Sequence, residues 1–242
     1  MSQRKIRKIV NQVKTANLKY KLIENGDRVA VAMSGGKDSF TLLYFLSLLP
    51  RYTPLRFSLV PIYIDLGWGN DVNTIRDYCA SFNLSLIMES TNIGEIVFNV
   101  RQEDHPCSLC ANMRRGALNR VAKAHGCDKV ALGHHLDDVV TTLFMSMLYE
   151  GRYKVFKPST YLDRVDITVI RPLIYVEERD ILLFMQSQNI SPVKNLCPAD
   201  GTTKRTKVAG LIDQIELDYP YAKRRILSSL EKADAGSFWG NA

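Results

Sequence analysis

The sequence predicts an α/β fold in which a parallel sheet carries helices on both faces. Short apolar runs rich in β-branched residues alternate with longer stretches whose apolar residues recur at helical spacing. One strand-like run also passes directly into a helix through a glycine pair, at residues 34–39. Strands that alternate with helices form parallel sheets, and such sheets bind ligands at the carboxyl ends of their strands.

The first predicted element is a basic amphipathic helix at residues 4–21. Its cations, with no acid among them, are Arg4, Lys5, Arg7, Lys8, Lys14, Lys19 and Lys21. Its apolar residues at helical spacing are Ile6, Ile9, Val10 and Val13. Two interpretations stay open at this point: a solvated face above a docked apolar stripe, or a surface that contacts nucleic acid.

The middle of the chain alternates between predicted strands and helices. The strands are at residues 28–33, 58–66, 84–88 and 129–133. The helices are at residues 40–49, 73–82, 113–125 and 139–149. This order predicts a Rossmann-like parallel sheet.

The pattern changes towards the C-terminus. Extended segments at residues 155–176 are broken by Pro158, Asp163 and Pro172. They are followed by a helix at 177–188, a polar loop at 189–207, and helices at 208–217 and 221–232. We therefore expect a basic helix at 1–22, a main domain at 23–190, a cysteine-bearing loop with a small helical C-terminal extension at 191–232, and a flexible tail at 233–242.

Composition limits the partners and the compartment. The chain has 242 residues, 46% of them hydrophobic, which is enough for one large α/β core. Its formal net charge of +7 favours a polyanionic partner. No stretch is long and apolar enough to span a membrane, and the N-terminus lacks the hydrophobic segment of a signal peptide. We expect a cytoplasmic protein with no membrane partner.

Residues 34–39, Ser-Gly-Gly-Lys-Asp-Ser, form the most informative motif. Adjacent glycines let the backbone curve round an anion, while first-turn N–H groups and the helix dipole attract negative charge. The two serines add hydroxyl donors and Lys37 adds a positive charge. The Walker A pattern is excluded, because Val31 stands at its first glycine and Asp38 follows the lysine. The motif predicts a different phosphate-binding loop, with a capped tight turn as the plainer alternative.

The five cysteines are an odd number, and in a reducing compartment they favour free, metal-bound or catalytic thiols. Cys107 and Cys110 lie on one turn just before a predicted helix, where both sulfurs can face one metal and the helix dipole favours their thiolates. This spacing fits half a zinc site, a redox pair, a cluster site or chance. Cys197 lies in a distant Pro/Gly loop, and spacing alone does not bring it to the pair. Cys79 and Cys127 are expected in the core.

Residues 133–138, Gly-His-His-Leu-Asp-Asp, end a predicted strand and open a helix. Asp137 and Asp138 either cap this helix or bind magnesium and handle protons beside a phosphate. We expect the two histidines to be hydrogen-bonding groups near nucleotide or substrate. Arg114 lies one turn after Cys110 and either steadies an activated base or phosphate or is a surface arginine.

In combination, these motifs resemble the tRNA 2-thiocytidine synthetase family (TtcA) of PP-loop ATPases, whose fold is adenine nucleotide alpha hydrolase-like. The resemblance runs in order from about residue 20 to about residue 230. It rests on residues 34–39, on Cys107-x-x-Cys110 followed by Arg114 and Arg115, on residues 133–138, on Arg171-Pro172-Leu173, and on Cys197.

The resemblance implies ATP-dependent thiolation of tRNA. The C2 carbonyl oxygen of a pyrimidine would attack the α-phosphate of ATP, and sulfur would then replace the adenylated oxygen. The favoured pyrimidine is a cytidine in the anticodon loop. A 4Fe-4S cluster would be held by Cys107, Cys110 and Cys197, which leaves one iron able to hold sulfide.

The resemblance also assigns roles to individual residues. The implied residues for binding ATP, with Mg2+, are Ser34, Gly35, Gly36, Lys37, Asp38, Ser39, Gly133, His134, Asp137 and, by position alone, Asp65. The implied catalytic residues are the three cysteines with Arg114 and Asp138.

The implied partners are tRNA, a sulfur donor that is sulfide or a cysteine desulfurase, and a second copy of the chain in a homodimer. Which basic group docks the tRNA stays open. The candidates are the N-terminal helix, Arg152 with Lys154 and Lys157, Lys204 with Arg205 and Lys207, and residues 223–225.

Two other functions stay open from the sequence. A PP-loop tRNA ligase or amidotransferase needs no cluster, so a coloured protein after anaerobic purification would disfavour it. A metal-binding, redox-sensing nucleic-acid protein would not turn over ATP, so ATP-dependent release of pyrophosphate would disfavour that function.

Overall fold

The computed structural model describes residues 3–101, 106–194, 196–197 and 204–233. It divides the chain into two units. The first contains Met1–His135 and Lys157–Asp200, and the second contains Leu136–Phe156 and Gly201–Ala242. The domain boundaries expected from the sequence stay a prediction, and the expected tail lies, apart from its first residue, outside the described residues.

The first unit is built on a sheet with the strand order β3-β2-β1-β4-β6-β5 in the described part of the chain. The strands are β1 Arg28–Met33, β2 Ser58–Asp65, β3 Ile87–Ser90, β4 Lys129–Ala131, β5 Ser159–Leu162 and β6 Ile167–Ile170. Neighbouring strands from β3 to β6 are parallel, so their carboxyl ends share one edge. The edge strand β5 is antiparallel to β6, so the sheet is mostly parallel with one antiparallel edge.

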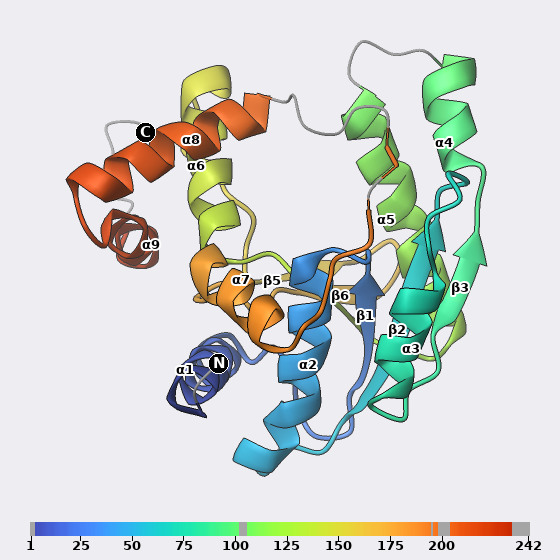
Figure 1. Ribbon diagram of the computed structural model, residues 1–242. Helices are drawn as coiled ribbons and strands as arrows, with labels where there is room; N and C mark the ends of the chain where they lie inside the picture. The colour runs from blue at the N-terminus through green and yellow to red at the C-terminus, as the bar shows by residue number, and fades with distance from the viewer. Residues whose placement is uncertain (1–2, 102–105, 195, 198–203, 234–242) are drawn as a thin grey trace. The chain divides into compact units, whose positions relative to one another are not determined.

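Helices cover both faces of this sheet, as the sequence predicts (Figure 1). They are α1 Gln3–Tyr20, α2 Lys37–Tyr52, α3 Asn73–Ala80, α4 Ile93–Glu95, the π-helical turn η1 Ile96–Arg101, α5 Pro106–Ala124 and α7 Glu178–Ser187. Helix α5 and the α4–η1 segment close a core over β1, β2, β4 and β6. Helices α2 and α3 lie on the opposite face, and β1 is buried between the two layers.

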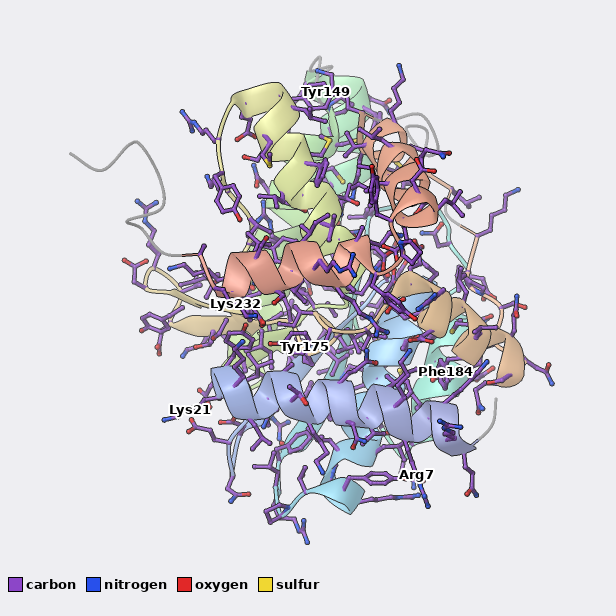
Figure 2. The ribbon with its side chains drawn as sticks, turned by 90° about the vertical axis from the view of Figure 1, so that its left-hand side faces the viewer. Arg7, Lys21, Tyr149, Tyr175, Phe184 and Lys232 are labelled. Carbon is purple, nitrogen blue, oxygen red and sulfur yellow. The ribbon has the colours of Figure 1, made fainter. Side chains whose placement is uncertain are left out.

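The basic helix α1 docks on the first unit through its apolar stripe. Ile9, Val10 and Val13 are fully buried, while Lys5 and Arg7 are exposed. Figure 2 looks onto this helix, with Arg7 labelled towards its N-terminus and Lys21 just after its C-terminus. The docked stripe is therefore confirmed, and the exposed cations remain available to a polyanion.

The second unit is helical. It contains α6 Leu136–Glu150, α8 Lys204–Asp218 and α9 Ala222–Glu231. Leu136 and Val140 of α6 pack against Val208 and Ile212 of α8 in a small apolar core. The second unit therefore groups α6 with the helices α8 and α9.

The structure differs from the sequence predictions in several local details. Strand β3 begins at Ile87, three residues after its predicted start. Helix α5 begins at Pro106 instead of residue 113, because proline is favoured at the first position of a helix, where its missing N–H costs nothing. The α4–η1 segment was not predicted at all.

No helix in the described part of the chain is long and apolar enough to cross a membrane.

Candidate functional site

Residues 34–39, here called the phosphate loop, join the carboxyl end of β1 to the N-terminus of α2. Gly35 has φ +77°, in the left-handed region that favours glycine, and Gly36 is the N-cap of α2. The Ser34 hydroxyl oxygen accepts a hydrogen bond from the Gly36 N–H at 3.3 Å, and the Ser39 hydroxyl donates to the Gly36 carbonyl at 2.8 Å. The loop therefore has the bent, amide-lined geometry that the motif predicts.

The cation of the loop lies between two carboxylates. Lys37 Nζ is 2.9 Å from Glu178 Oε1 of α7 and 3.2 Å from Asp38 Oδ2. Burial acts to lower the pKa of Lys37, but Asp38 and Glu178 outweigh it and raise that pKa above its ordinary value. The ammonium is charged at neutral pH, and it has three N–H donors with which to bind these carboxylates or a phosphate.

The end of β4 packs directly on the phosphate loop. A Cβ at Gly133 would lie 3.1 Å from the backbone of Asp38, so a larger residue would push the two segments apart. The buried His135 places Nε2 3.5 Å from Asp38 Oδ1. His134 Nδ1 lies 3.3 Å from Arg171 Nε, which donates to it. Residues 133–135 therefore belong to the same edge of the sheet as the loop.

Asp137 and Asp138 lie in the first turn of α6 and form ion pairs within the second unit. Asp137 Oδ1 is 2.6 Å from Lys223 Nζ, and Asp138 Oδ1 is 2.6 Å from Arg205 Nη2. Arg205 and Lys223 both belong to the basic groups proposed from the sequence to dock tRNA, and nothing local in the sequence indicated these ion pairs. Binding of magnesium or protons by the two aspartates stays a prediction.

The three motif cysteines are brought together within the first unit. Cys107 and Cys110 lie inside the first turns of α5 rather than before the helix, as the sequence had placed them. Burial raises the pKa of the Cys110 thiol, Arg114 opposes this, and nearby Cys197 and Cys107 raise the pKa further. The dipole-favoured thiolate predicted for Cys110 is therefore not what the structure shows.

The segment that carries Cys197 is anchored on the phosphate loop. The Val193 N–H donates to the Gly35 carbonyl at 2.8 Å, and the Val193 side chain fills the space beside Gly35. Cys197 follows Val193 by four positions, and an extended chain spans at most about 3.5 Å per residue, so this cysteine lies within about 14 Å of Val193. Sequence reasoning missed Val193, because a lone valine in a polar loop carries no signal.

Arg114 lies near Cys110 and β2, and Asp65 is the last residue of β2. Arg114 acts electrostatically both on Cys110 and on Tyr63, a buried residue of β2. Asp65 ends β2 and accepts a hydrogen bond from the Gly67 N–H at 2.9 Å. Arg114 therefore lies between the thiols and the carboxyl edge of the sheet.

Comparison with known proteins agrees with this arrangement. A family model described as a PP-loop domain matches residues 1–208. A tRNA-cytidine(32) 2-sulfurtransferase from Citrifermentans bemidjiense is 39% identical over 92% of this chain and 89% of its own. A protein of the same name from Geobacter sulfurreducens is 40% identical over 93% of this chain and 89% of its own.

The chain belongs to the tRNA-cytidine(32) 2-sulfurtransferase family of PP-loop proteins.

A solved structure from outside this sulfurtransferase family supports the same fold. The U34-tRNA thiolase NcsA from Methanococcus maripaludis, solved with its [4Fe-4S] cluster, aligns with a TM-score of 0.78 at 25% identity. The alignment covers 94% of this chain and 78% of NcsA. The predicted fold class and the predicted family are both confirmed.

The donor set of this sulfurtransferase fits an iron-sulfur cluster. Cys107, Cys110 and Cys197 are soft thiol donors, which suit iron-sulfur clusters. Among the described residues, no three Cys, His, Asp or Glu side chains come close enough together to share a single metal ion. A cluster needs wider spacing than one ion, because each thiolate binds a different iron.

Proposed function

We propose that this protein uses ATP to activate C2 of cytidine 32 in tRNA and replaces the C2 oxygen with sulfur. One observation carries the proposal: the cysteine-bearing segment is hydrogen-bonded to the phosphate loop through Val193 and Gly35. Activation and sulfur transfer act on the same carbon in succession, so their two sites must be close. The names of the relatives supply the base and its position.

Residues 34–39 would hold the phosphates of ATP. The amides of the loop and the N-terminus of α2 face the anion, and Lys37 exchanges Glu178 for a phosphate oxygen. Asp38 is a carboxylate of the kind that binds Mg2+. With the phosphates fixed, the C2 oxygen attacks the α-phosphorus, pyrophosphate leaves, and the former carbonyl oxygen becomes part of a good leaving group.

Cys107, Cys110 and Cys197 would hold the 4Fe-4S cluster, which when bound supplies the sulfur-transfer chemistry. Arg114 then lies where it can hold the activated base or its phosphate, because its cation already acts on both Cys110 and Tyr63. When sulfur is bonded to C2, the bond from C2 to the adenylated oxygen breaks and AMP leaves. The partly buried environment of Cys110 would limit the access of water to the sulfur.

The remaining partners follow from the substrate. The exposed cations of α1 would bind tRNA phosphates, with contributions from the exposed groups Arg152 and Lys154. Sulfide or a cysteine desulfurase would replenish the sulfur, and the protein would act in the cytoplasm as a homodimer. Cytidine 32 belongs to a single-stranded loop, so it can leave its stack at low cost.

The test is the 2-thiocytidine content of tRNA in cells that lack this protein. The nucleoside should disappear, and it should return with the wild-type gene or with Cys79→Ser, whose cysteine lies in the core. Cys197→Ser should not restore it. Persistence of 2-thiocytidine in the deletion strain, or its rescue by Cys197→Ser, would contradict the proposal.

A further inference from the structure

Arg171 is a buried cation to which the mechanism above gives no role. It directly follows β6 and is 9% exposed. Its Nη1 donates to the Lys157 carbonyl at 2.6 Å, and its Nε donates to His134 Nδ1 at 3.3 Å. Burial lowers the pKa of Arg171 to about 10, and the neighbouring Arg115 acts in the same direction. The guanidinium therefore remains charged at neutral pH.

This contact fixes the chemical form of His134. A guanidinium has only N–H donors, so the nitrogen that faces it must carry a lone pair. His134 Nδ1 is that nitrogen, and the single ring proton is consequently on Nε2. Protonation of Nδ1 would set two N–H groups and two cations against each other in a poorly hydrated place.

The neighbouring His135 has the opposite environment. Its Nε2 lies 3.5 Å from Asp38 Oδ1, so its neighbour is an anion instead of a cation. The charged groups at this edge are Asp38 beside His135, Lys37 and Glu178 next to Asp38, and Arg171 with Arg115 on the side of His134. Two adjacent histidines with opposite partners can perform different tasks.

His134 also lies at a useful place. It follows Gly133, whose backbone packs on Asp38 in the phosphate loop. We propose that Arg171 is a positioning residue that holds His134 neutral with its proton on Nε2, so that His134 donates a hydrogen bond to a phosphate oxygen of the bound nucleotide. The nucleotide contact rests on the proposed function, whereas the form of His134 does not.

The form of His134 can be read by NMR. In wild-type protein with 15N-labelled histidine, the His134 signals, assigned by their loss in His134→Gln, should show a lone pair on Nδ1 and a proton on Nε2. This pattern should persist at pH 6.0, where a free histidine is largely protonated. ATP with Mg2+ should shift the Nε2 signal. A proton on Nδ1, ordinary titration, or an Nε2 signal that ATP leaves unmoved would overturn the proposal.

Variants test whether Arg171 acts through His134. Arg171→Met should let His134 titrate normally, and it should lower tRNA-dependent pyrophosphate release at least tenfold. The double variant with His134→Gln should be no slower than His134→Gln alone, since residues that act as a unit are not additive. Additive losses would overturn the proposal.

Arg120→Met serves as the matched control, because Arg120 is an exposed arginine paired with Glu89 at 2.8 Å. It should change neither the NMR signals nor the rate. The wild-type NMR measurement decides the form of His134 even where a variant folds poorly or the protein has a different substrate.

Discussion

Gly35→Ala tests the link between the phosphate loop and the cysteine segment. The substitution has two costs. Gly35 has φ +77°, where an alanine costs about 1–2 kcal/mol. Its Cβ would also lie 2.9 Å from the Val193 Cβ, and overpacking of this kind costs about 1–3 kcal/mol. Gly35→Ala should therefore lower the free energy of unfolding by roughly 2–5 kcal/mol.

Gly26→Ala is the matched control, since Gly26 has φ +88° and no atom lies within 4 Å of the place that the added methyl group would take. It should cost only the backbone term, about 1–2 kcal/mol in urea unfolding. Val193→Gly in the Gly35→Ala background removes the clashing Cβ and should recover part of the loss. Equal stability of Gly35→Ala and Gly26→Ala would show that Val193 does not press on the loop.

Three further predictions can be checked separately. Phe184→Ala removes a fully buried ring of α7 that packs on Tyr44 and Phe45. It should lower the free energy of unfolding, measured in urea, by about 3–5 kcal/mol. The control Leu182→Ala changes an exposed residue of the same helix and should lower it by no more than about 0.5 kcal/mol. In cluster-free protein at pH 8, iodoacetamide should modify the exposed Cys107 while Cys79 stays unmodified until the protein unfolds. Burial raises the pKa of Cys79 to about 12 and so removes its reactive thiolate. Equal labelling of the two cysteines in mass spectra would contradict this. Arg7→Glu on the exposed face of α1 should weaken tRNA binding and lower its salt dependence by about one phosphate contact, with ATP affinity unchanged; a parallel loss of ATP binding would refute the assignment.

The sequence alone predicts the structure correctly wherever a local pattern of residues determines it. Alternating apolar runs predict the sheet and its two helical layers, and the Ser-Gly-Gly motif predicts a bent loop at a helix start, because both depend on near neighbours in the chain. Pro106 was a local signal for the early start of α5. The prediction missed it because the apolar periodicity begins only near Met113. The antiparallel direction of β5 had no local signal in the sequence, since it depends on how the strand pairs with β6.

The contacts that shape the site are long-range, and no spacing rule encodes them. Lys37 meets Glu178, Gly35 meets Val193, and His134 meets Arg171 only after the chain has folded. In two of these pairs the partner, Glu178 or Val193, belongs to no motif. Motif analysis could therefore name the groups that carry the chemistry, but not the residues that orient them.

The ion pairs of Lys37 have a consequence for which anions the loop accepts. One ammonium faces two carboxylates, so the side chains at this point hold more negative than positive charge. These side chains therefore add little attraction for a naked polyanion such as inorganic phosphate, which leaves the amides of the loop and the helix dipole to attract it. A nucleotide that arrives with a divalent cation brings counter-charge for the same carboxylates, so the side chains of the loop favour metal-bound nucleotides over metal-free ones.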